Sequence, residues 1–85
     1  LEEYKLRMRG IIVDYVKANP AKEQILRLFL NKRTISFRDV RDVPDFERLL
    51  CDMVRNNILY YDPTLAIFYP QGRSLEWGIK LYFTT

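Results

Sequence analysis

The chain has 85 residues, of which 48% are hydrophobic and 29% are charged, and its formal net charge at pH 7 is +3. This length suits one domain and is too short for two, and the composition excludes a disordered or collagen-like chain. No apolar run approaches the about 20 residues that a membrane-spanning helix needs, so we expect no membrane contact. The chain begins without Met and with charged residues. We therefore expect a single domain, residues 1–85, taken from a longer polypeptide.

The residue types that serve most side-chain catalysis are missing. Cys51 is the only cysteine, and the sequence contains no histidine. This excludes a zinc site of the usual Cys/His kind and any Ser-His-Asp or Cys-His arrangement. None of the three glycines is followed by lysine, so a phosphate-binding loop is excluded as well. We expect a non-enzymatic domain with no metal or cofactor and, because no intrachain disulfide can form, a cytoplasmic location.

Two helices are predicted at the start of the chain. Residues 2–18 place apolar side chains on one helical face, although the glycine at position 10 weakens this helix. Asn19-Pro20 ends it, because a residue before proline avoids helical geometry, and Pro20 then suits the first turn of a second helix over residues 20–31. The residues expected to face the core are Tyr4, Met8, Ile11, Ile12, Tyr15 and Val16 in the first helix and Ile25, Leu28 and Phe29 in the second.

The middle of the chain combines a short extended segment with an amphipathic helix. Residues 34–37 are of types that favour a strand, and residues 38–43 suit a brief helical turn. A third helix is predicted from Pro44-Asp45 to Asn56. An asparagine just after the last apolar residue suits a left-handed C-cap. The apolar face of this helix consists of Phe46, Leu49, Leu50, Met53 and Val54.

A β-hairpin and a final helix are predicted for the rest of the chain. Residues 58–61 and 65–69 form two strands, joined by the turn Asp62-Pro63-Thr64. Residues 73–82 form the last helix, whose aromatic side chains we expect to pack on the core or on a partner. A helix that leads directly into a short hairpin is typical of a winged helix. The predicted fold is α+β and mainly α: a winged helix-turn-helix with a small antiparallel sheet and an added helix at each end.

A winged helix-turn-helix often binds DNA, and here the helix ending at Asn56 would enter the major groove. Its polar positions include three acids and two arginines, so it carries a net charge of −1 and would be repelled by DNA phosphates. Arg48 and Arg55 share a face and could reach guanine edges or phosphates. They could instead be solvated or pair with Asp45 and Asp52 at helical spacing, and we favour this second interpretation.

Other basic residues offer weaker evidence for a nucleic-acid contact. Four of them lie around the start of the motif: Lys32, Arg33, Arg38 and Arg41. They are candidates for DNA or partner contacts, but cations at a helix end also complement the helix dipole without any ligand. The hairpin tip, Asp62, Pro63 and Thr64, offers no Lys or Arg to follow a phosphate backbone. The aromatic residues of the hairpin could stack on bases, but strand alternation places roughly half of them in the core.

Several residues between Leu49 and Lys80 form a recognisable pattern. They are Leu50, Val54-Arg55-Asn56-Asn57-Ile58-Leu59, Tyr61-Asp62-Pro63, and Tyr69-Pro70-Gln71-Gly72-Arg73-Ser74-Leu75 with Trp77 and Ile79. This pattern resembles the C-terminal module of the archaeal P-loop ATPase family, in which a nucleotide-binding domain of the AAA+/STAND type precedes a winged-helix domain. The resemblance implies a parent protein that binds ATP, with this chain as its regulatory or docking end. It assigns no ATP contact to any residue, because the nucleotide-binding motifs are absent here.

Three hypotheses follow. The leading one is a non-catalytic winged-helix domain that docks on the ATPase core or on a protein partner. The alternative is a winged helix that contacts duplex DNA through Arg48 and Arg55, with the four basic residues named above on phosphates. The third is dimerisation through the added terminal helices, residues 1–18 and 73–83.

Overall fold

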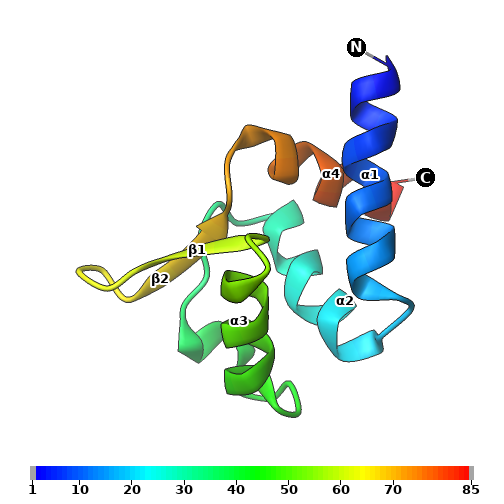
Figure 1. Cartoon of the computed structure of the whole chain (residues 1–85). Coiled ribbons are helices and arrows are strands. Elements are labelled where there is room, and N and C mark those ends of the chain that lie inside the picture. The colour runs from blue at the N-terminus through cyan, green and yellow to red at the C-terminus, as the bar shows by residue number, and fades with distance from the viewer. Residues whose placement is uncertain (1, 85) are drawn as a thin grey trace.

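The computed structural model describes residues 2–84. Within this range the chain forms four α-helices, two short 3₁₀ helices and one antiparallel sheet of two strands (Figure 1). In chain order they are α1 (Glu2–Val16), α2 (Pro20–Arg27), η1 (Leu28–Leu30), η2 (Phe37–Val40), α3 (Phe46–Arg55), β1 (Leu59–Asp62), β2 (Ile67–Pro70) and α4 (Arg73–Thr84). The domain is therefore mainly helical with a small sheet, as predicted. No helix in the described range is long and apolar enough to cross a membrane.

The first and last helices lie side by side, and the hairpin projects from the opposite side of the domain (Figure 1). The backbones of α1 and α4 approach so closely that Gly78 has no room for a side chain on the α1 side. The Tyr4 hydroxyl and Ser74 Oγ also form a hydrogen bond between the two helices. The two ends of the described chain are thus joined to each other within one molecule.

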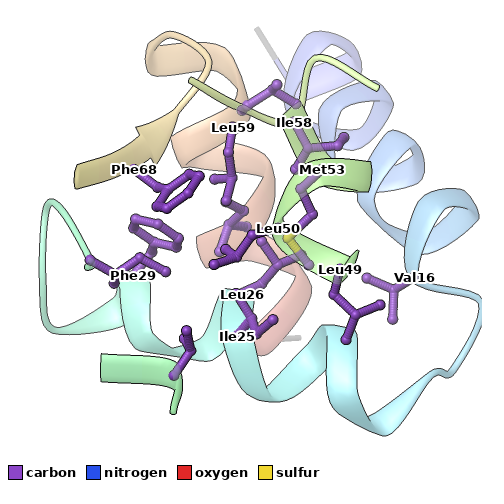
Figure 2. Close-up of a cluster of buried hydrophobic side chains, with 14 of the residues drawn as sticks. Val16, Ile25, Leu26, Phe29, Leu49, Leu50, Met53, Ile58, Leu59 and Phe68 are labelled. Carbon is purple, nitrogen blue, oxygen red and sulfur yellow. The ribbon is translucent and has the colours of Figure 1, made fainter. Parts of the chain in front are cut away.

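One hydrophobic core connects these elements. Side chains from α2, α3 and the hairpin converge in it, as Figure 2 shows. Its buried members are Ile12, Val16, Ile25, Leu26, Phe29, Ile35, Val40, Val43, Leu49, Leu50, Met53, Ile58, Leu59, Phe68, Leu75 and Ile79. In α1 the expectation was too broad: Ile12 and Val16 are buried, but Tyr4 and Ile11 are exposed because they lie at the edges of the helical face.

The junction between the first two helices contains the predicted break. α1 ends at Val16, two residues earlier than predicted, because Lys17 and Ala18 have φ values of 47° and 57°, which a right-handed helix does not allow. Asn19 then caps α2, where its Oδ1 accepts hydrogen bonds from the backbone N–H groups of residues 21 and 22 at 3.0 and 3.2 Å.

The second helix is shorter than predicted. The α-helix stops at Arg27, and η1 continues it as a 3₁₀ turn from Leu28 to Leu30. The tighter turn changes the spacing of the side chains. Leu28, the first residue of this turn, is only half-buried, whereas Leu26 of α2, which the prediction left out, is fully buried.

The predicted strand over residues 34–37 is wrong except at one position. Ile35 pairs with Phe68 of β2 through two backbone hydrogen bonds of 2.9 and 2.7 Å. The chain then turns into η2, because the backbone N–H and the hydroxyl of Ser36 both donate to the Asp39 carboxylate, at 2.8 and 3.3 Å. This local side-chain bonding competes with strand pairing and starts a helical turn instead.

The end of α3 matches the predicted left-handed cap. Asn57 has a φ of 60°. Its N–H donates to the carbonyl of Val54 at 3.1 Å, and the N–H of Ile58 donates to the carbonyl of Met53 at 2.8 Å. These two bonds form a Schellman motif, and the residues Met53 and Ile58, which usually form its apolar contact, both belong to the buried core. The chain leaves this cap directly into β1.

The hairpin is confirmed, with a longer turn than predicted. Asp62 lies opposite Ile67 in the register, so the turn covers residues 63–66 and the second strand begins two residues late. The Asp62 carboxylate accepts hydrogen bonds from the N–H groups of Thr64 and Leu65 at 2.9 and 3.3 Å. This Asx turn leaves Leu65 outside the sheet and largely exposed to solvent.

Candidate functional site

The two arginines of α3 lie in different electrostatic settings. Arg48 pairs with Asp45 at 3.1 Å, and both side chains are exposed. Arg55 forms no hydrogen bond or ion pair with any described residue, although Asp52 precedes it at helical spacing. Arg48 is therefore paired and Arg55 is exposed without an ion pair, and both outcomes fall within the favoured interpretation of solvated or paired arginines.

Asp52 is occupied by a residue of α1. The Tyr15 hydroxyl donates to its Oδ2 at 2.5 Å. Burial and this hydrogen bond raise the pKa of Tyr15 above its ordinary value, so the phenol is a stable donor. Lys22 of α2 contacts the same tyrosine. Its Nζ lies 4.1 Å from the ring centroid of Tyr15 and donates a hydrogen bond to the Tyr15 carbonyl at 3.1 Å. These contacts direct Asp52 away from Arg55.

Arg55 instead lines an apolar groove between η2, α3 and the hairpin, with a volume of about 420 Å³. The groove is lined by Phe37, Cys51, Val54, Arg55, Tyr61 and Phe68. The rings of Phe37 and Tyr61 both contact that of Phe68, with centroid distances of 5.3 and 4.6 Å. Phe37 is 42% exposed, so this aromatic wall is open to solvent. Among residues 2–84, Arg55 is the only charged residue that lines it.

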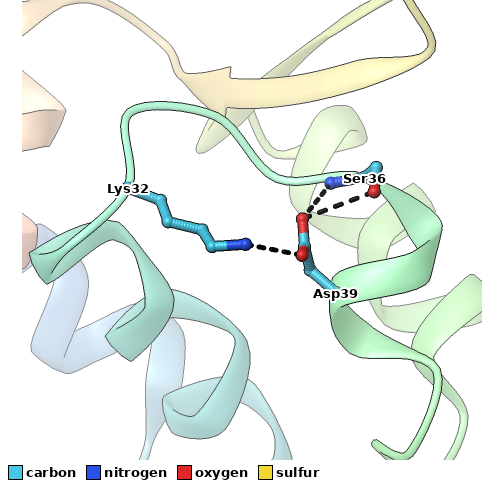
Figure 3. A network of polar contacts seen from close by, with 3 residues as sticks. All are labelled: Lys32, Ser36 and Asp39. Atoms are coloured by element: carbon cyan, nitrogen blue, oxygen red, sulfur yellow. Dashed lines mark hydrogen bonds and ion pairs between the residues drawn. The ribbon is translucent and has the colours of Figure 1, made fainter.

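The four other basic candidates do not gather at this groove. Lys32 pairs with Asp39 at 2.6 Å, beside the Ser36 hydrogen bonds (Figure 3). That pairing and the Ser36 N–H lower the pKa of Asp39. Arg33 lines a separate pocket of about 370 Å³ with Arg73 at the start of α4. The remaining two, Arg38 and Arg41, are exposed and form no ion pair within the described chain.

The hairpin tip has the acidic character predicted for it. Asp62 is bound to backbone N–H groups of the turn, and Pro63 and Thr64 are exposed. Behind the tip, the rings of Tyr60 and Tyr69 contact each other on one face of the sheet, with centroids 5.2 Å apart. Neither the turn nor these rings supplies a cation for a phosphate.

The surface of α1 and α4 leaves two large aromatic side chains exposed, Tyr4 and Trp77. Trp77 is 41% exposed, and Lys5 Nζ lies 5.5 Å from its ring centroid. Tyr82 and Phe83 pack partly against the core, as expected, whereas Trp77 does not. Tyr4, Leu6, Ile11 and Val13 of α1 are also exposed, so apolar surface remains on these two helices and the dimer hypothesis stays a prediction.

The groove was not predicted as a site. The sequence pattern predicts a strand at Phe37, and it assigns Cys51 no role in a site. The available signal was the spacing of Cys51, Val54 and Arg55, which places all three on one side of α3. Comparison of the chain with protein-family models, curated protein sequences and solved structures finds no match.

Proposed function

We propose that this chain is a non-catalytic winged-helix domain that docks on a protein partner through the groove between α3 and the hairpin. The order α2, α3, hairpin supports the winged-helix assignment, and the isolated Ile35–Phe68 bridge adds one paired position beside the two-stranded sheet. With the resemblance to archaeal ATPases, the leading partner is the nucleotide-binding core of a longer, cytoplasmic chain.

One observation carries the proposal: the open surface beside α3 is aromatic and almost uncharged. The centres of protein–protein interfaces are enriched in aromatic residues and arginine and depleted in lysine and acids. The groove has this composition, with Phe37 and Tyr61 beside the single cation Arg55. A DNA-binding surface at the same place would need several cations for the phosphates.

Duplex DNA remains the alternative partner, and the free guanidinium of Arg55 favours it. The other charged residues of α3 disfavour DNA binding. Arg48 is neutralised by Asp45, and Glu47 adds an exposed negative charge to the same helix. An approaching DNA backbone would therefore meet one free cation and one free anion on this helix.

Titration of the domain with duplex DNA at about 50 mM and about 200 mM salt separates the two functions, because phosphate contacts weaken steeply with salt. We expect no binding at either salt concentration. Micromolar binding that falls with salt and is lost in the Arg48→Ala/Arg55→Ala variant would reject the docking proposal in favour of the alternative.

A positive test selects peptides from a random display library on the immobilised domain. Phe37→Ala should lower the affinity of the domain for the selected peptides by about tenfold or more, as is typical of an interface anchor. Trp77→Ala is the matched control, since Trp77 has nearly the same exposure as Phe37 and lies outside the groove. If Trp77→Ala weakens peptide binding and Phe37→Ala does not, the docking surface lies on α1 and α4 instead.

A further inference from the structure

The unpaired guanidinium in an otherwise apolar groove indicates what kind of segment the groove binds. We propose that its occupant is an acidic amphipathic segment of a partner protein, which places an apolar side chain against Phe37 and Tyr61 and a carboxylate on Arg55. This inference rests on the proposed docking function and adds the chemistry of the partner to it.

The first support is that α3 supplies no carboxylate to Arg55. Asp45 is paired with Arg48, and Asp52 accepts the Tyr15 hydroxyl. The side chain of Arg55 is exposed and makes no polar contact within residues 2–84. Guanidinium groups bind carboxylates through two parallel hydrogen bonds, so a free arginine beside a groove favours a carboxylate on the ligand.

The second support is the position of Arg55 at the end of its helix. It is the last residue of α3, where the helix dipole places about half a negative charge. This partial charge stabilises the cation without neutralising it, so the groove keeps a net positive end. A lysine- or arginine-rich segment would be repelled there, whereas an acidic segment would be attracted.

The third support is the shape and chemistry of the rest of the lining. The volume of about 420 Å³ holds one aromatic or branched aliphatic side chain with room to spare. The walls around it are Phe37, Val54, Tyr61 and Phe68. An isolated phosphate or a nucleic-acid backbone would satisfy Arg55 and leave these walls exposed to water. A segment with both an apolar and an acidic side chain satisfies both parts of the groove.

Two small molecules that differ only in charge test this pairing. Naphthylacetate carries an apolar ring and a carboxylate, and naphthylacetamide carries the same ring with a neutral amide. Amide-resolved NMR titrations should show both probes shifting the resonances of the groove. The carboxylate should bind about fivefold more tightly, as befits an ion pair that is partly exposed.

The Arg55→Gln variant should bind the two probes equally, because it keeps the length of the side chain and removes the charge. Arg48→Gln is the matched control: Arg48 is on the same helix and already paired, so the preference for the carboxylate should remain. Alkylation of Cys51, the only thiol in the chain, should block both probes and thereby confirm that they occupy the groove.

Equal binding of both probes to the wild type, or a carboxylate preference that survives in Arg55→Gln, would overturn the inference. So would failure of either probe to shift the groove resonances. If the selected display peptides are basic or neutral and their binding depends on Phe37, the inference is overturned but the proposed docking function is retained. A dimer in sedimentation that Arg55→Gln dissociates would identify a second copy of the chain as the occupant, and DNA binding that needs Arg55 would overturn both proposals.

Discussion

Gly78 of α4 lies directly against the carbonyl group of Met8 in α1. A Cβ built at position 78 would be 2.7 Å from the Met8 oxygen and 3.2 Å from Cγ1 of Ile12. The nearer contact is with backbone, so no rotation of a side chain can relieve it. The terminal helices are therefore packed at a distance that only glycine permits at this position.

Gly78→Ala should destabilise the domain by about 1–3 kcal/mol, because the added methyl group must push α1 and α4 apart. Gly10→Ala is the matched control: it lies in the middle of α1 with nothing within 4 Å of its Cβ position. That substitution should stabilise the domain by about 0.5–1 kcal/mol through helix propensity alone. Urea unfolding of both variants measures the difference. If both were stabilised equally, the close packing of the two helices would be disproved.

The Asp39 carboxylate should make stability depend on pH in the acid range. Hydrogen bonds from Lys32 and from the Ser36 N–H lower its pKa below the ordinary value of 3.8. A carboxyl group with a lower pKa in the folded state contributes stability above pH 3.8 that is lost as pH falls through the folded pKa. Asp39→Asn should therefore cost about 1 kcal/mol near neutral pH, the usual value of such a cap, and much less in strong acid.

Unfolding curves of the wild type and Asp39→Asn at neutral and acid pH test this dependence. Asp42→Asn provides the control, because Asp42 is exposed and forms no ion pair with any described residue. If Asp39→Asn lowers the free energy of unfolding equally at both pH values, the carboxylate charge does not stabilise η2.

The elements that are bounded by capping, proline or turn residues could be predicted from the sequence. Asn19-Pro20 marks a helix boundary because both the proline and the capping side chain act within three residues. Asn57 could be predicted as the left-handed cap because its effect is also local. The hairpin could be predicted because the turn residues Asp62-Pro63-Thr64 separate two short runs of strand-favouring residues. In each case the deciding interactions connect residues that are close in the sequence.

The groove could not be predicted in the same way, because it depends on contacts between distant residues. The strand propensity of residues 34–37 is outweighed by the Ser36–Asp39 hydrogen bonds, and only then does Phe37 reach the hairpin. The sequence spacing suggests an ion pair between Asp52 and Arg55. In the structure Asp52 instead accepts a hydrogen bond from Tyr15, which is 37 residues away in the sequence. The free charge at the groove can therefore be recognised only when the contact between Tyr15 of α1 and Asp52 of α3 is known.

The hydrogen bond between Tyr15 and Asp52 should also affect stability at high pH. Because burial and the bond raise the pKa of Tyr15 above 10, the folded state keeps the phenol protonated after the unfolded chain has begun to lose its proton. This stability is fully present below pH 10 and is lost as pH rises toward the folded pKa. Tyr15→Phe should unfold with a weaker pH dependence in this range, measured by denaturant titration at several alkaline pH values.

The same substitution should change the groove at a distance. In Tyr15→Phe the carboxylate of Asp52 loses its donor, and Arg55, three residues further along α3, is the unpaired cation of this helix at helical spacing. The pair that forms would compete with a ligand carboxylate, so the preference for naphthylacetate over naphthylacetamide should fall from about fivefold toward equality. Tyr82→Phe is the control, because it removes an equivalent bond to Glu23 of 2.5 Å on a different surface. A preference that is unchanged in Tyr15→Phe would show that Arg55 does not compete for Asp52, whereas equal losses in both variants would indicate a general loosening of the fold.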